Sequence, residues 1–125
     1  MTSPADLATH TILQVYPSEK DWYVWLDGVE AKGVDPLSGL QFDSYDHALS
    51  TAMQGLGVAL GMQPYVERDI RSGLLVELFP GKRVKAAGQW YLVCRQERAD
   101  NEKVKAFRDW MLAEIASDSD LKEVL

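Results

Sequence analysis

Polar residues suited to binding a small molecule stand at both ends of residues 40–62, LQFDSYDHALSTAMQGLGVALGM. Asp43 and Ser44 precede a helical pattern, and a helix N-terminus offers free N–H groups and the positive end of the helix dipole. These groups favour a carboxylate or other anion, whereas the charge of Asp43 opposes one, so a zwitterionic or amide ligand suits both. The alternative role of the pair is to cap the helix. We expect a ligand site at Asp43, Ser44 and the adjoining Tyr45.

The pattern around these residues predicts a strand, a helix and a second strand. Residues 40–42 are a short β-prone run, and apolar residues from Tyr45 to Leu56 then recur at the spacing of a helix with one buried face. Gly55 and Gly57 end that helix before the apolar run 58–60. A crossover helix joins parallel strands, and ligands bind at the carboxyl ends of such strands. The residues that follow the second strand therefore join the expected site, each with a turn or core role as its alternative: Gly61, Met62 and Gln63.

The segments before and after this unit extend the alternation of strands and helices. Residues 11–16 predict a strand ended by Pro17, and residues 21–32 predict an amphipathic helix. Trp22 and Trp25 lie on the inner face of that helix, where we expect core anchors rather than a ligand cage. Further along we expect a short helix at 65–71, strands at 74–79 and 89–94, and a helix at 101–117; residues 1–10 are expected to be an irregular lead-in and 118–125 a frayed tail. This order predicts an α/β fold with a parallel-type sheet and helices on both faces.

Charge and composition exclude several classes of protein. The 125 residues are 46% hydrophobic, enough for the core of one domain. The net charge is -6, whereas binding to duplex nucleic acid requires clustered Lys and Arg. The densest basic group, Lys82, Arg83 and Lys85, follows a Pro-Gly turn, and we expect a solvated loop there without nucleic-acid contact. The chain shows neither a signal-peptide pattern nor an apolar run near the ~20 residues that span a bilayer, so we expect a cytoplasmic protein without membrane contact.

The reactive side chains form no recognisable catalytic or metal-binding set. Cys94 is the single cysteine, which excludes an internal disulfide and a cysteine-based zinc site, and we expect it to be a buried, inert thiol. His10 and His47 lack a serine elbow, an HExxH motif or paired metal-ligand spacing. We therefore expect no enzyme activity, no metal and no cofactor.

Several motifs in order resemble a known family. The segment FDSYDHALSTAMQGLGVALGMQPYVERDIRSGLLVELFPG, followed by WYLVCRQERAD and VKAFRDWMLAEI, is similar to the C-terminal part of the effector-binding domain of LysR-type transcriptional regulators. The motifs DWYVWL, FDS and VALG resemble the branch that holds the glycine-cleavage activator and the β-lactamase regulator. The resemblance runs from about Ala5 to Ser117. It includes no winged helix-turn-helix, no linker helix and no first half of the effector domain, so the chain resembles a piece of a regulator.

The resemblance carries expectations about architecture and site. It implies one lobe of a type II periplasmic-binding-protein-like effector domain, with subdomain II at residues 11–94. Residues 95–117 would be the C-terminal helix that returns toward subdomain I, which this sequence lacks. The resemblance also places Trp90 near the ligand cleft.

The C-terminal helix should lack a cover if subdomain I is absent. Its apolar face includes Phe107, Trp110 and Met111, through which we expect self-association into a dimer or larger assembly. Two functions therefore stay open. The chain either senses a small effector, such as an amino-acid- or peptide-like compound, to control transcription through a DNA-binding part outside it, or it serves as an oligomerisation or docking segment without a ligand of its own.

Overall fold

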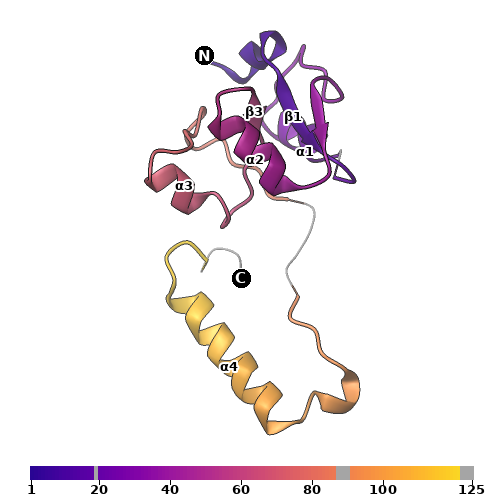
Figure 1. Cartoon of the computed structure of the whole chain (residues 1–125), viewed down its shortest axis with the longest axis vertical. Helices are drawn as coiled ribbons and strands as arrows, with labels where there is room; N and C mark the ends of the chain where they lie inside the picture. Colours follow the sequence, from indigo (N-terminus) through magenta and orange to yellow (C-terminus); the bar gives the residue numbers. More distant parts are fainter. Residues whose placement is uncertain (19, 87–90, 122–125) are drawn as a thin grey trace.

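The computed structural model describes residues 1–18, 20–86 and 91–121 of the chain. Its strands are β1 (Ile12–Val15), β2 (Leu40–Phe42) and β3 (Val58–Ala59). Its α-helices are α1 (Asp21–Gly28), α2 (Tyr45–Met53), α3 (Glu67–Arg71) and α4 (Glu102–Ser117), and two 3₁₀ helices are η1 (Pro4–Thr9) and η2 (Gln96–Arg98). Figure 1 shows the three strands and α1 to α3 gathered together, with α4 lying apart from them in the lower part of the view.

The strands form one parallel sheet in the order β2-β1-β3. Leu13 pairs with Leu40 on one side of β1 and with Ala59 on the other. The two strands that α2 connects are therefore separated by β1, which is the central strand. The predicted strands at 11–16, 40–42 and 58–60 are confirmed, as is the parallel α/β class.

Helices cover both faces of this sheet (Figure 1). Ile12, fully buried, packs with Leu7, Trp22 and Leu26 in one core cluster. Successive residues of a strand point to opposite faces, and α2 contributes the buried residues Ala48 and Leu49 to the core. The predicted core role of Trp22 is confirmed, because its side chain is 3% exposed and its Nε1–H donates to the Leu13 carbonyl at 2.9 Å.

One glycine fixes the start of β2. Gly39 has φ of +86°, a conformation that side chains other than glycine rarely adopt. A Cβ atom at this position would stand 1.9 Å from the Ile12 carbonyl oxygen. The loop therefore approaches β1 more closely than a residue with a Cβ would allow. The next residue, Leu40, then pairs with Leu13 of β1.

The lead-in segment is more ordered than expected. Residues 4–9 form η1, and Leu7 is buried against the core. The backbone N–H groups of Thr2 and Ser3 donate to the Asp6 carboxylate at 2.7 Å and 3.0 Å. The expectation of an irregular segment was wrong because Ser3, Pro4 and Asp6 together make a helix-start signal.

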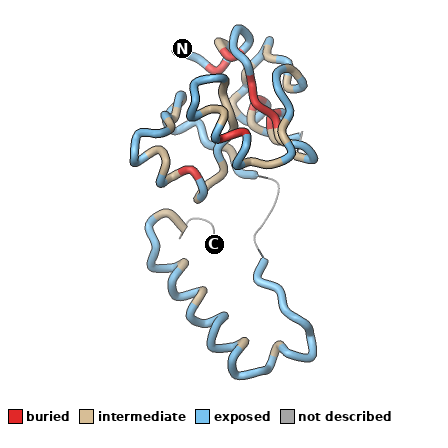
Figure 2. The backbone as a smooth tube through the Cα atoms, in the orientation of Figure 1, coloured by how far each residue is buried: buried red, intermediate tan, exposed pale blue. Residues whose placement is uncertain are grey.

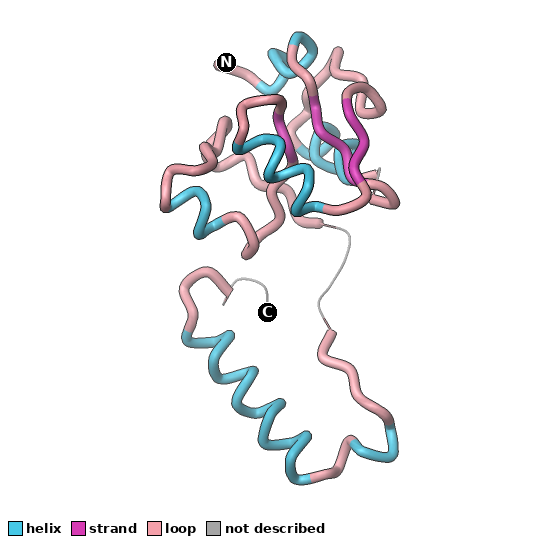
Figure 3. The backbone as a smooth tube through the Cα atoms, in the orientation of Figure 1, coloured by secondary structure: helices cyan, strands magenta, loops and turns pink. Residues whose placement is uncertain are grey.

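Two expected strands are not strands in the described residues, as Figure 3 shows. Residues 74–79 begin with the N–H groups of Leu74 and Leu75 bonded back to the Asp69 carbonyl, and the segment makes no ladder with the sheet. Tyr91 to Cys94 are exposed and likewise outside the sheet, while residues 89 and 90 lie outside the described part. Apolar, β-prone composition made both segments read as strands, but a strand also requires a partner.

Two smaller expectations also need correction. Cys94 is exposed, not buried, because the segment that carries it makes no sheet contact. Helix α1 ends at Gly28, before the expected end near position 32, and Val84 packs where a Cβ of Gly28 would stand. The predicted short helix is confirmed as α3, and the last predicted helix as α4 with Asn101 at its N-cap.

The buried residues lie in the sheet-containing part of the chain (Figure 2). In contrast, α4 contains no buried residue, although it is the longest helix described. Phe107, Trp110 and Leu112 are each about half exposed. The chain thus combines a packed α/β unit with an amphipathic helix whose apolar side chains remain accessible.

Candidate functional site

The carboxyl ends of all three strands lie at one edge of the sheet, because the strands are parallel. The loop after β1 leads through Ser18 to α1, the loop after β2 leads through Ser44 to α2, and β3 continues to Gly61. Two adjoining hollows lie among these segments, and both are lined by Asp21 and Leu60. The ligand site predicted from the sequence lies at this edge.

The first hollow is small and lies between α1, α2 and the sheet. Its cavity volume is about 10 Å³, comparable with the space for the centre of one water molecule. Its lining is mostly apolar, with Ser18, Asp21 and Tyr45 as the polar exceptions. Leu13, Val15, Trp22, Ala48 and Leu60 complete it.

A hydrogen bond between two helices closes the polar side of this hollow. The hydroxyl of Tyr45, at the start of α2, donates to Oδ2 of Asp21, at the start of α1. Burial and the Asp21 carboxylate raise the pKa of Tyr45, while a hydrogen bond from Ser18 lowers it to a smaller degree. The hydroxyl therefore stays protonated at neutral pH and holds the carboxylate in place.

The second hollow is wider and more open to solvent. Its cavity volume is about 60 Å³. The lining residues other than Asp21 are uncharged: Val24, Trp25, Leu60, Gly61, Met62, Val84 and Ala86. Trp25 is held there by its Nε1–H, which donates to the Lys82 carbonyl at 3.1 Å, and by an aromatic contact with Phe79 at a centroid distance of 6.0 Å. Together the two hollows offer an apolar surface with one carboxylate at its centre.

The structure brings some of the predicted site residues to the hollows and leaves others away from them. Tyr45 lines the first hollow, whereas Gly61 and Met62 line the second. Ser44 instead caps α2 by accepting the His47 N–H at 3.3 Å. The Asp43 carboxylate is exposed and contacts His47 Nδ1 at 3.1 Å. Gln63 lines neither hollow, and Trp90 lies outside the described residues.

Sequence reasoning did not identify Asp21 as a site residue. It placed Asp21 only at the start of the amphipathic helix expected at residues 21–32. The sequence-based prediction considered only the residues after the strands at 40–42 and 58–60. The end of β1 lies at the same edge of the sheet. The loop after β1 also delivers residues there, and Asp21 is the first residue of the helix that follows that loop.

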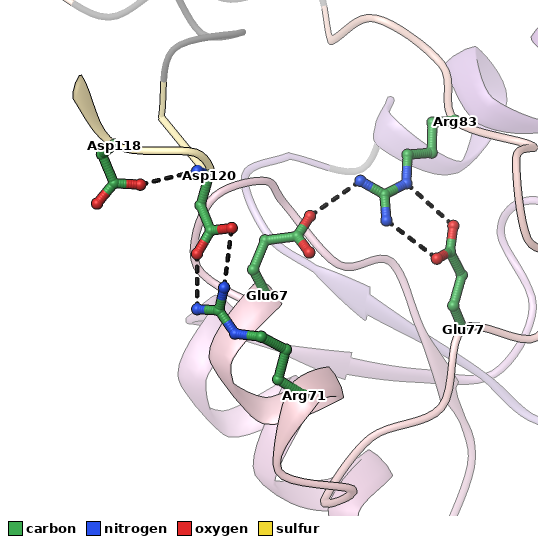
Figure 4. Close-up of polar contacts among 6 residues, drawn as sticks. All are labelled: Glu67, Arg71, Glu77, Arg83, Asp118 and Asp120. Carbon is green, nitrogen blue, oxygen red and sulfur yellow. Dashed lines mark hydrogen bonds and ion pairs between the residues drawn. The ribbon is translucent and has the colours of Figure 1, made fainter. Parts of the chain in front are cut away.

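Ion pairs hold the segments that flank the second hollow. Arg83 bonds to Glu77 through two nitrogens, at 3.0 Å each, and to Glu67 of α3 at 2.9 Å (Figure 4). Arg71 of α3 contacts Asp120, beyond α4, at 2.6 Å. Arg83 is thus paired rather than freely solvated, which corrects part of the expectation for residues 82–85.

The chain is similar to known transcriptional regulators over most of its length. A family model for the LysR substrate binding domain matches residues 1–116. The glycine cleavage system transcriptional activator of Escherichia coli is 32% identical over 96% of this chain and 39% of its own length. The transcriptional activator AmpR of Pseudomonas aeruginosa is 32% identical over 88% of this chain and 36% of its own length. The chain thus spans about two fifths of these relatives.

A solved structure shows the same arrangement. The effector domain of AmpR from Pseudomonas aeruginosa superposes with a TM-score of 0.66 and 27% sequence identity, over 91% of this chain and 54% of that domain. The architecture is accordingly of the periplasmic-binding-protein-like α/β class. The chain belongs to the LysR substrate-binding domain family, and the predicted resemblance to that family is confirmed.

The described residues contain neither a candidate metal site nor a candidate membrane span. Among residues 1–18, 20–86 and 91–121, no three His, Cys, Asp or Glu side chains are grouped to hold a metal ion. None of the helices in that part of the chain has the length and apolar character needed to cross a bilayer. The matched relatives named above are transcriptional activators rather than enzymes.

Proposed function

We propose that this chain is the ligand-sensing part of a LysR-type transcriptional regulator, acting in the cytoplasm. The observation that supports it most directly is the pair of hollows at the carboxyl edge of a parallel sheet, in a chain that belongs to this family. In open parallel sheets that edge is where ligands bind. A small effector bound there would alter transcription through a DNA-binding part outside these residues.

The chain's own residues suggest how such sensing would work. The hollows are formed by segments from α1, from β3 and from the loop near Val84, so a ligand would contact all three. A ligand shifts a conformational equilibrium only by its difference in affinity between two arrangements. The effector would therefore favour whichever arrangement of the regulator keeps these segments together. Affinity of this chain alone should be weak, because the hollows are shallow and bury little of a ligand.

The test is a binding screen by amide chemical-shift mapping. The uniformly ¹⁵N-labelled chain is titrated with a panel of amino acids, short peptides and aromatic acids, and we expect shifts at Asp21, Leu60 and Gly61. Ala86→Trp fills the second hollow from its exposed side and should abolish those shifts. Ala113→Trp, on the exposed surface of α4, is the matched control and should preserve them. A full panel that leaves the hollow residues unshifted would overturn the proposal.

A second candidate function rests on a different observation. No residue of α4 is buried, yet Phe107, Trp110 and Met111 give it an apolar face. The rings of Phe107 and Trp110 contact each other in a tilted arrangement at a centroid distance of 5.8 Å, which gathers that face into one patch. An apolar helix face left exposed binds another surface. Self-association through this face, or docking onto a regulator without any ligand, is therefore the alternative to sensing.

A further inference from the structure

In the part of the chain that the structure describes, Asp21 is the one charged residue that lines either hollow, and it lines both. It is partly buried at the first residue of α1. Tyr45 occupies Oδ2 from the α2 side. Among the described residues, no Lys, Arg or His side chain pairs with Asp21, and Oδ1 accepts no hydrogen bond.

A partly buried carboxylate without a countercharge is a poor arrangement for stability alone. Removing it from water costs free energy that only a cation or several donors offset. Tyr45 supplies one donor, on one oxygen. The remaining oxygen is available to a positively charged donor that enters the second hollow from solvent.

The rest of the second hollow suits an apolar group attached to that donor. Val24, Trp25 and Met62 line it, and none of its described lining residues is a Lys, Arg or His that could bind a ligand carboxylate. A ligand carboxylate near Asp21 would instead experience repulsion, which strengthens in a partly desolvated site. The net charge of -6 also attracts cations to the molecule over longer distances.

We propose that Asp21, oriented by Tyr45, binds the ammonium group of a ligand whose apolar part lies on Trp25 and Met62. This inference rests on the proposed sensing function and specifies the chemistry of that site. It differs from the sequence-based expectation, which placed a zwitterionic or amide ligand at Asp43 and Ser44. Those two residues are occupied with the cap of α2 and with His47. The ligand class is a primary amine with a small aliphatic or aromatic body.

Three probes of matched shape test this inference: 3-methylbutylamine, 3-methylbutan-1-ol and 3-methylbutanoate. We expect the amine at pH 7 to shift the amides of Asp21, Leu60 and Gly61 at the lowest concentration, the alcohol to bind more weakly and the carboxylate to bind least. Asp21→Asn keeps the shape and removes the charge, and it should weaken amine binding at least about tenfold, the size expected for a charge-assisted hydrogen bond. Asp27→Asn removes the same charge from an exposed position of α1 and should leave amine binding within about twofold.

A second measurement needs no variant. Raising the salt concentration from 20 mM to 500 mM should weaken amine binding and leave alcohol binding nearly unchanged, because salt screens charge interactions. The inference would be overturned if the amine binds no better than the alcohol. It would also be overturned if the amine binds equally well to Asp21→Asn and to the native chain. If the carboxylate or the alcohol binds at the hollows and the amine does not, the ammonium assignment is wrong while the sensing function stands. The sensing function itself is tested by the separate panel of amino acids, short peptides and aromatic acids. It would be overturned if no compound of that panel shifts these residues.

Discussion

Tyr45 connects the starts of two helices that are far apart in the sequence. Its hydroxyl donates to Asp21, and the two residues are separated by 24 positions in the chain. Burial and the neighbouring carboxylate raise the pKa of Tyr45 above its ordinary value of about 10. Because the pKa is raised on folding, the protonated phenol stabilises the fold at any pH below about 10. That contribution is lost as the pH rises through the higher folded-state value.

Replacing the tyrosine should therefore have a pH-dependent effect. We expect Tyr45→Phe to lower the free energy of unfolding by about 1 kcal/mol at pH 8, the usual loss for a partly exposed hydrogen bond. The difference from the native chain should shrink at pH 10.5, because above about pH 10 the phenol ionises more readily in the unfolded chain than in the folded one. Urea unfolding followed by tryptophan fluorescence at both pH values measures it. Tyr23→Phe, at an exposed position of α1, is the control and should change little; an equal loss from Tyr45→Phe at both pH values would contradict the assignment.

Helices α2 and α4 begin with similar caps but differ in what they pack against. Ser44 Oγ accepts the His47 N–H at 3.3 Å, and Asn101 Oδ1 accepts the Lys103 N–H at 3.0 Å. Helix α2 buries Ala48 and Leu49 against the sheet, whereas α4 buries nothing. A cap stabilises the whole fold only if its helix belongs to the cooperative core.

The two caps should consequently respond differently to removal. Ser44→Ala should lower the free energy of global unfolding by about 1 kcal/mol, and Ser44→Asp, which can still cap, should retain most of it. Asn101→Ala should increase fraying of α4 and leave the unfolding midpoint of the sheet unchanged. Urea unfolding and amide hydrogen exchange measure the two effects. An equal global loss from Asn101→Ala would mean that α4 folds as part of the core.

The whole molecule consists of a packed α/β unit and a less supported C-terminal helix. The tail after α4 meets α3 through the ion pair of Arg71 and Asp120, but exposed ion pairs contribute little stability, generally below about 1 kcal/mol. The AmpR effector domain is nearly twice as long as the region it shares with this chain. The apolar face of α4 is thus free to bind another surface, including that of a second copy.

Self-association through α4 is a prediction about the assembled state. We expect the average mass to rise above 14.0 kDa with concentration in sedimentation velocity experiments. Trp110→Lys should restore the monomer by placing a charge on the apolar face. Leu37→Lys adds the same charge at another exposed apolar position and should not affect assembly. A native chain that stays monomeric across the whole concentration range would contradict the prediction.

Local patterns in the sequence determined most of the elements. Helix α2 could be read from its apolar spacing and its Ser44 cap, and α4 from the same kind of pattern after Asn101, because a helix is satisfied by hydrogen bonds within its own segment. The short strands β1 to β3 were also recognisable from apolar runs between turn residues. Order and spacing of the motifs indicated the family, and with it the class of fold.

Tertiary structure alone decided which segments meet. Residues 74–79 have the composition of a strand but take no place in the described sheet, since strand pairing depends on a partner distant in sequence. For the same reason, the sequence pointed to Tyr45 together with Asp43 and Ser44, whereas in the structure Tyr45 lines the first hollow with Asp21 and the other two predicted residues do not. A cap or a helical face is set by neighbours within four residues. A binding hollow is set by the packing of loops that only the folded sheet brings to one edge.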